Sequence, residues 1–483
     1  MKKGLKIVLI AVFVLFFLAI SLIVLKPFLS RGKLFAGYYL TYQVNEDSKT
    51  CTVTKHISLG EKDVVIPEQI GRYRVTAIGE YAFANRQKLK SISLPSSITT
   101  IGMGAFYECS GLAEINIPKS TTSIGSYAFY GCSALKSITL PETIQTIGAG
   151  VLEGCSALTE ANVPASAIYS LPADNITSVV INSGTSIGTN AFQNFEKLKN
   201  IIIAPTVQTV GTGLFQKCKN ITYATVPTCV LTELPKDALT HVVINSGTHI
   251  PEKAFLYAPN LTSVTVSQSV ESIGKMAFSG CYKLVEVYNL SSIDIKKGDT
   301  GNGGIGRYAL NIYTSTQEKS KTWADENGYL FFEDGETCYL LGFMGKDKNL
   351  VLPQNCHGKP YLVHQYAFYN DAELATVTIP EGVLGVDAYA FYHCASLTSV
   401  FLPDGLVTIG EYAFADCENL KEISFAKETT MIGAFAFEDC DHLMSVHFRG
   451  TTEEWKSVTQ GYNWMYYAPA KEVVCSDGTI PLK

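Results

Sequence analysis

The sequence predicts a solenoid of leucine-rich repeats, in which a parallel β-sheet alternates with turns and short helical or 3₁₀ segments. The pattern I-G-x-x-A-F-x-x-C occurs at Ile101–Cys109, Ile124–Cys132, Ile409–Cys417 and Ile432–Cys440. The central aromatic residues recur every 23 residues, as at Phe83, Phe106 and Phe129. Self-similarity at a fixed period of about 20–29 residues is typical of this class of solenoid.

A second motif, L-x-x-I-x-L-P, precedes the first in each repeat, as at Leu89–Pro95. Its alternating apolar residues predict a short strand, which proline ends because it has no N–H for a further ladder bond. The glycine after isoleucine suits a tight or positive-φ bend. We expect Phe129 to be a buried plug between Phe106 and Leu152, because one unit cannot bury its apolar face but stacked units can.

The 23-residue spacing breaks twice in the same way. Steps of 40, 23, 40 and 23 residues separate Leu152, Phe192, Phe215, Phe255 and Phe278. Each step of 40 equals one ordinary repeat of 23 plus 17 extra residues. We interpret the extra residues as shorter coils with strands of their own at Val179–Ile181 and Val242–Ile244.

The combined pattern, L-x-x-I-x-L-P-x-x-I-x-x-I-G-x-x-A-F-x-x-C, resembles the leucine-rich repeats of BspA-like surface proteins. The resemblance covers most of residues 60–448. It implies a non-catalytic adhesion or ligand-binding protein whose ligand is a protein or glycan on a host or neighbouring cell surface. The family shares a repeat and not one ligand, so the resemblance implies a class of function only.

An apolar run at residues 7–25 follows Lys2, Lys3 and Lys6, and its only polar member is Ser21. Nineteen residues are about the span of a bilayer, and no clear small-x-small cleavage site follows. We therefore expect an uncleaved signal anchor, so that residues 7–25 hold the protein in the cell membrane. Positive charges nearly balance across the run, so the resemblance decides that the repeats are extracellular. The alternative is secretion after signal cleavage.

The repeat pattern also divides the chain into parts. We expect a cytoplasmic tip and transmembrane helix at 1–25, a linker at 26–37, a β-rich N-terminal cap at 38–75, a first repeat block at 76–290, an inserted β-module at 291–362, a second block at 363–448 and a C-terminal cap at 449–483. The inserted module contains one degenerate repeat, Ile305–Leu310, and a hairpin around Asp334-Gly335. Caps cover the open ends of a solenoid.

Composition narrows the class of function. The chain has 483 residues, of which 47% are hydrophobic, and these are enough for a substantial core. A net charge of −6 without a basic stripe argues against nucleic acid as a partner. The glycines of residues 301–306 fit G-x-G-x-x-G but lack the strand and helix of a dinucleotide site. No catalytic motif is present, and the sequence indicates no cofactor.

The regular place of the cysteines favours packing over chemistry. Of 13 cysteines, eight lie three residues after a plug position, namely Cys109, Cys132, Cys155, Cys218, Cys281, Cys394, Cys417 and Cys440. Neighbouring coils would hold their Cβ atoms about 4.8 Å apart, wider than the roughly 3.5–4.5 Å of a disulfide. We expect reduced thiols, with disulfides or a metal as alternatives. Cys338 and Cys356 could pair within the insert. The spacing of His442 and His447 does not fit a zinc site.

The outward positions of the strand motif are its third and fifth residues. Most are small, hydroxylic or acidic, but four stand out as candidate ligand-binding residues, namely Tyr223, Tyr288, Phe401 and His447. Exposed aromatic residues contribute strongly to binding, and Phe401 with His447, two coils away, is the pair to mutate first. Alternatively, Phe401 and Tyr288 fill gaps beneath the insert or a cap. A different function, a structural spacer or scaffold for envelope or membrane proteins, predicts a uniform face.

Overall fold

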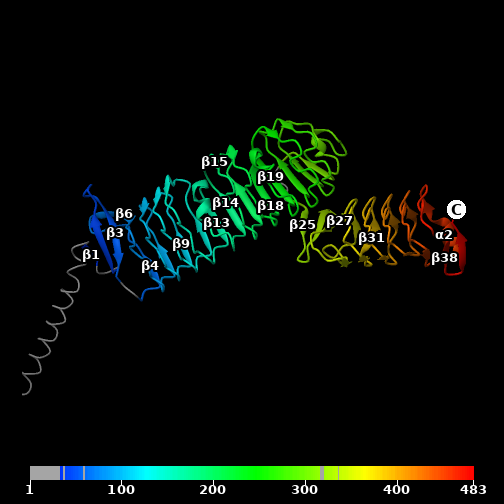
Figure 1. The fold of residues 1–483 in the computed structure, drawn as a ribbon, viewed down its shortest axis with the longest axis horizontal. Helices are drawn as coiled ribbons and strands as arrows, with labels where there is room; N and C mark the ends of the chain where they lie inside the picture. The colour runs from blue at the N-terminus through cyan, green and yellow to red at the C-terminus, as the bar shows by residue number, and fades with distance from the viewer. Residues whose placement is uncertain (1–32, 36–38, 58–59, 316–319, 336, 483) are drawn as a thin grey trace, which may run out of the picture. The chain divides into compact units, whose positions relative to one another are not determined.

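A computed structural model describes residues 33–35, 39–57, 60–315, 320–335 and 337–482 (Figure 1). The chain divides into two compact units, Met1–Pro235 and Lys236–Lys483, so the boundary lies inside the predicted first block. The transmembrane helix predicted at 7–25 lies outside the described residues. In the described part of the chain, no helix is long and apolar enough to cross a membrane.

The first unit consists of short strands and two 3₁₀ helices. Its strands are β1 (Lys33–Phe35), β2 (Leu40–Val44), β3 (Thr50–His56), β4 (Asp63–Val65), β5 (Gln69–Ile70), β6 (Tyr73–Ile78), β7 (Ser91–Ser93), β8 (Thr100–Ile101), β9 (Glu114–Asn116), β10 (Ser123–Ile124), β11 (Ser137–Thr139), β12 (Thr146–Ile147), β13 (Glu160–Val163), β14 (Ser178–Ile181), β15 (Ser186–Ile187), β16 (Asn200–Ile203), β17 (Thr209–Val210) and β18 (Tyr223–Pro227). Its described helices are η2 (Ala165–Ser170) and η3 (Thr228–Val230).

The second unit continues the same architecture. Its strands are β19 (His241–Ser246), β20 (His249–Ile250), β21 (Ser263–Val266), β22 (Ser272–Ile273), β23 (Glu286–Asn289), β24 (Asn311–Tyr313), β25 (Thr322–Ala324), β26 (Tyr329–Asp334), β27 (Thr337–Phe343), β28 (Asn349–Val351), β29 (Tyr361–Val363), β30 (Thr376–Thr378), β31 (Val383–Val386), β32 (Ser399–Phe401), β33 (Thr408–Ile409), β34 (Glu422–Phe425), β35 (Met431–Ile432), β36 (Ser445–Phe448), β37 (Thr459–Gln460), β38 (Glu472–Cys475) and β39 (Gly478–Pro481). Its described helices are η4 (Asn302–Gly304) and α2 (Thr452–Ser457).

Successive coils pair through parallel strands, which confirms the predicted solenoid. Ile101 of β8 pairs with Ile124 of β10, which pairs with Ile147 of β12, so the strand register advances by 23 residues a coil. These isoleucines point inward, and the first two are buried. Figure 1 shows the strands of each unit side by side, with their turns on the other side of the coil.

The interruptions of the 23-residue period are shorter coils, as predicted. Glu160 of β13 pairs with Ser178 of β14, a step of 18 residues, and Ser178 pairs with Asn200 of β16, a step of 22. These two steps sum to the observed 40. The 3₁₀ helix η2 replaces the longer turn segment in the short coil and buries Ala167 and Ile168.

The A-F-x-x-C segments are turns rather than regular helix, and their local hydrogen bonds join residues three apart, as in a 3₁₀ turn. Phe106 N–H donates to the carbonyl of Ala128 in the next coil at 2.8 Å, whereas Tyr107 N–H donates locally to the carbonyl of Gly104 at 2.9 Å. Alternate N–H groups thus form a further ladder between coils, in addition to those of the strands. In an α-helix, all of these N–H groups would donate to carbonyls of the same segment, and the bonds between coils would be lost.

The glycine after isoleucine is required by the close approach of neighbouring coils. A Cβ atom at Gly125 would lie 2.4 Å from the backbone N of Met103. Gly125 itself has no positive φ, so of the two expected reasons for glycine only the tight approach applies. The left-handed residues lie two and six positions later, at Tyr127 with φ 57° and Gly131 with φ 71°. Backbone also approaches the missing Cβ within 3.0 Å at Gly102, Gly148, Gly211, Gly274, Gly410, Gly433 and Gly461.

The phenylalanine plugs stack on one another through the core. Phe129 is fully buried, and its ring centroid lies 5.3 Å from that of Phe106, which lies 5.4 Å from that of Phe83. The same stacking joins Phe192 with Phe215, Phe255 with Phe278, and Phe368 through Phe391 and Phe414 to Phe437. The plug prediction is confirmed.

The ladder cysteines are free, buried hydrogen-bond donors. Cys132 Sγ donates to the carbonyl of Phe106 at 3.3 Å, and the same carbonyl accepts the Cys109 N–H at 3.1 Å. All eight thiols make the equivalent bond, at 2.9 to 3.3 Å, and none is in a disulfide. Burial raises the pKa of the Cys109 thiol to about 11, which keeps its proton in place. The expected reduced ladder is confirmed in the fold.

Thiol counting should reproduce this assignment in solution. Of the 13 cysteines, two are paired, so a denatured and unreduced chain should expose eleven reactive thiols. In the folded protein the eight ladder thiols should react slowly, because they are buried and protonated. Finding only one or two free groups after denaturation would contradict the ladder.

The ends and the insert complete the solenoid. Strand β1 pairs antiparallel with β2, so residues 33–35 of the predicted linker are a strand, which extends the hydrogen bonding of the β2 edge. Strands β26 and β27 pair antiparallel as the predicted hairpin. The degenerate repeat leads into β24, which pairs in parallel with β23. After the last repeats, helix α2 begins with a capping box at Thr451 and buries Trp455.

Candidate functional site

The outer face of the strands is the surface that the sequence predicts for binding. In the first unit its fifth-position residues, such as Ser93, Asn116 and Thr139, are exposed. Alternation within each strand therefore separates a core side from a solvent side. Most side chains on this face are small and polar, so a large exposed apolar side chain differs clearly from its neighbours.

Phe401 lies on this face and is its most prominent apolar group. Its side chain is 72% exposed. In the sheet β28-β30-β32, Phe401 is in register with Thr378, and Thr378 is in register with Val351, which is 63% exposed. Exposed apolar residues thus occupy the same strand position two coils apart, with a threonine methyl between them. The alternative that Phe401 fills a gap beneath a cap is wrong.

His447 occupies the equivalent position in the neighbouring sheet, β34-β36-β38-β39. It is half-buried and is in register with Ser424 on one side and Val474 on the other. Among the described residues, no hydrogen bond or ring contact joins His447 to Phe401. The two residues therefore contribute separately to one strand face of the second unit.

Tyr223 belongs to the first unit. Its side chain is 48% exposed on β18, in register with Asn200 of β16. Ile202, two residues along β16, is 43% exposed. Tyr223 is thus a second exposed aromatic residue on a strand face, in a different unit from Phe401 and His447.

Tyr288 is buried, so its prediction as an exposed ligand-binding residue is wrong, and the alternative that it fills a gap beneath the insert is confirmed. Only 5% of its surface is exposed, its hydroxyl donates to Glu286 at 3.2 Å, and its ring lies 4.8 Å from that of Tyr313. Glu286 is fully buried and also accepts bonds from the Ser320 hydroxyl at 2.6 Å and the Lys321 N–H at 2.9 Å. Tyr313, Ser320 and Lys321 of the inserted module cover this part of the sheet, which the strand pattern alone cannot show.

A row of stacked tyrosines on the turn side was missed by the sequence analysis. Ring centroids lie 5.1 Å apart between Tyr366 and Tyr389, 4.9 Å between Tyr389 and Tyr412, and 5.0 Å between Tyr412 and Phe435. All four residues have positive φ, between 53° and 61°. Their spacing of 23 residues is visible in the sequence, but the strand pattern contains no information about which turn residues stack.

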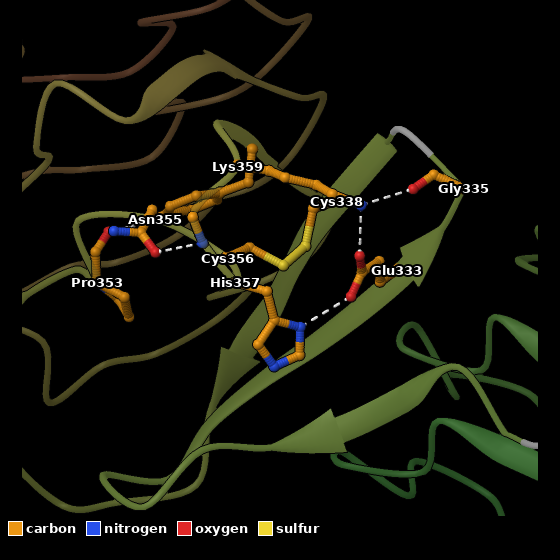
Figure 2. Close-up of a disulfide and its surroundings, with 10 residues drawn as sticks. Glu333, Gly335, Cys338, Pro353, Asn355, Cys356, His357 and Lys359 are labelled. Carbon is orange, nitrogen blue, oxygen red and sulfur yellow. Dashed lines mark hydrogen bonds and ion pairs between the residues drawn. A yellow bond between two sulfur atoms is a disulfide. The ribbon is translucent and has the colours of Figure 1, made fainter.

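The inserted module contains a compact polar cluster beside a disulfide. Figure 2 shows Cys338 bonded to Cys356, with Glu333 between His357 and Lys359. Glu333 accepts from Lys359 Nζ at 2.7 Å and pairs with His357 Nδ1 at 2.8 Å, and these two bonds lower the pKa of its carboxyl. Glu333, Cys356 and His357 are close enough to share a metal, but the Cys356 sulfur is bonded to another sulfur.

Comparisons with known proteins identify the repeats. A family model described as "BspA type Leucine rich repeat region" matches residues 62–174, 167–285, 248–297 and 348–459. A leucine rich cell surface protein from Faecalibacterium prausnitzii has 22% identity over 91% of this chain and 93% of its own, with a TM-score of 0.29.

Two further solved structures are similar to this chain. A leucine-rich repeat protein from Bacteroides ovatus has 24% identity over 89% of this chain and 91% of its own, with a TM-score of 0.29. The T. pallidum Leucine Rich Repeat protein has 25% identity over 39% of this chain and 91% of its own, with a TM-score of 0.32. No curated protein matches the sequence. The family model matches more than half of the chain, and the chain therefore belongs to the BspA-type leucine-rich repeat family.

Proposed function

We propose that this protein is a non-catalytic cell-surface adhesion or binding module that holds a protein ligand on the strand face of its second unit. The observation that carries the proposal is the exposure of Phe401, at 72%, in register with the exposed Val351 across Thr378. Proteins of this repeat class are generally binding scaffolds that present an extended surface. An apolar patch on an otherwise polar surface is typical of an interaction site.

The alternative, a structural spacer, is less well supported by this surface. A spacer needs only stacked coils, and its strand face could be uniformly small and polar, as it is at Ser93, Asn116 and Thr139. Exposing the ring of Phe401 brings no burial and so no gain in folding free energy. The patch therefore favours a role in contact with another molecule.

Loss of the patch should weaken ligand binding without affecting the fold. The full-length chain is first assayed against an array of purified extracellular-matrix proteins and glycans. For the ligand found, Phe401→Ser combined with His447→Ser should weaken binding at least about tenfold, which is within the range of interface hot spots. Its thermal melt should be nearly unchanged, because Phe401 packs little.

Tyr462→Ser is the matched control, because Tyr462 is also an exposed aromatic residue, at 73%, but lies on a turn outside the strand face. It should bind the ligand like the wild type. Unchanged affinity in the folded double variant would remove this face from the proposal. Binding restricted to glycans would contradict the choice of a protein ligand.

We also propose that residues 7–25 anchor the protein in the membrane with the repeats outside the cell. The supporting observation is the apolar run itself, which is about as long as a bilayer is thick.

Protease added to intact cells should digest the repeats, and the undigested chain should fractionate with membranes. Repeats that resist protease would contradict the orientation. A mature chain that begins after residue 25 would contradict the anchor and support secretion.

A further inference from the structure

A cleft of about 690 Å³ lies in the second unit, on the turn side of the coils. Two segments far apart in sequence form its walls, residues 257–283 and residues 366–371, and Phe343 of the hairpin closes one side. A volume of this size is within the usual range for small-molecule sites. No residue of the cleft belongs to the strand face described above.

Tyrosine rings form the walls of the cleft. The ring centroid of Tyr282 lies 4.7 Å from those of both Tyr366 and Tyr369, so the three rings hold one another in place. Tyr257, on the same lining, is 64% exposed. Rigid, flat surfaces with polar hydroxyl edges suit a ligand that has an apolar face and a polar rim.

A buried lysine, Lys283, lines the same cleft. Lys283 is only 8% exposed, and its Nζ donates to Asn260 Oδ1 at 3.2 Å. Asn260 is fixed in turn, because its Nδ2 donates to the carbonyl of Asp237 at 2.7 Å. Within the described ranges, no carboxylate lies in ion-pair distance of Lys283. An ammonium has three donors, so two remain, and a buried charge requires compensation.

The position of this ammonium is built into the fold. A Cβ at Gly342, where φ is 146°, would lie 2.5 Å from the backbone carbonyl oxygen of Ala367 and 2.3 Å from Lys283 Nζ, so a side chain at this position would displace the ammonium. Asp371 is the nearby acidic residue, but its Oδ1 accepts the N–H groups of Glu373 and Leu374 at 3.2 Å each. Burial lowers the pKa of Lys283 to about 8, partly opposed by the charge of Asp371, so the side chain is mainly cationic at neutral pH.

We propose that this cleft binds a carboxylate-bearing sugar, such as a uronic or sialic acid residue of a glycan. One C–H face of the sugar ring stacks on the tyrosines, and the carboxylate accepts charge-assisted hydrogen bonds from Lys283. The hydroxyls of the sugar bond to Asn370 and Asp371 at the rim. This site is independent of the protein ligand proposed for the strand face, because the two share no residue.

The test uses the full-length chain and three probes of similar ring size, measured by saturation-transfer NMR and titration at pH 7. Methyl glucuronide should bind saturably. Methyl glucoside, which lacks the carboxylate, and cyclohexanecarboxylate, which lacks the hydroxyls, should each bind at least about tenfold more weakly. N-acetylneuraminic acid then distinguishes a sialic acid site from a uronic acid site.

Variants assign the binding to the cleft. Lys283→Met and Tyr369→Ala should each weaken methyl glucuronide binding at least about tenfold. Tyr412→Ala should not, because Tyr412 belongs to the row of rings that begins at Tyr366 but lies outside the cleft. Should Lys283→Met fail to fold, the comparison of Tyr369→Ala with Tyr412→Ala decides. No saturable glucuronide binding, equal binding of the neutral sugar, or equal loss in both tyrosine variants would overturn the proposal.

Discussion

Replacing Phe129 with alanine is expected to destabilise the protein by about 3–5 kcal/mol, the usual cost of removing a fully buried phenylalanine. The ring is fully buried and stacks on Phe106 at 5.3 Å. Its loss leaves a cavity between coils that the rigid ladder of backbone hydrogen bonds cannot close. The loss should be local, because each coil of a solenoid depends mainly on its neighbours.

A thermal melt and hydrogen exchange measure this effect. Amides of residues 101–155 should lose protection first. Phe401→Ala is the matched control, since it removes the same side chain from an exposed site and should change stability by no more than about 0.5 kcal/mol. An unchanged melt with unchanged protection of these coils in Phe129→Ala would show that the ring is not a plug.

Replacing Gly125 with alanine is expected to cost about 1–3 kcal/mol or more, the range for overpacking a tight site. The added Cβ would lie 2.4 Å from the backbone N of Met103, and a backbone atom cannot move aside as a flexible side chain can. The coils around residues 101–132 must separate, which weakens their hydrogen bonds.

Gly405→Ala provides the comparison, because the nearest atom to a Cβ there is 3.5 Å away and φ is not positive. Chemical denaturation of both variants should show a lower midpoint for Gly125→Ala only. Equal midpoints would mean that the coils do not approach as closely as the structure places them.

The repeat itself was predictable because one physical requirement acts on every coil. Phe129 must fill the same space as Phe106, and Cys132 must satisfy the Phe106 carbonyl as Cys109 satisfies that of Phe83, so identical side chains recur at 23-residue steps. The 23-residue period of the sequence therefore follows from the stacking of the coils.

The rest of the structure depends on contacts that periodicity does not encode. The role of Gly125 follows from the distance between backbones, which the sequence does not state. Burial of Tyr288 depends on where the insert folds, and that segment has no repeat. The cleft beside Lys283 also combines distant segments, so no local pattern indicates it. Tyr127 adopts a positive φ that residue preferences disfavour, because the ladder between coils fixes its backbone.

Site-specific photocrosslinking most directly tests the claim that the strand face of the second unit binds the ligand. A photoreactive phenylalanine analogue replaces Thr378, between Phe401 and Val351, or Thr139, at the same strand position in the first unit. Both positions are exposed, so both variants should fold. With the matrix protein that the array identifies, irradiation should yield a covalent adduct from position 378 and none from position 139. An adduct from position 139 alone, or from neither position while binding is intact, would contradict the account.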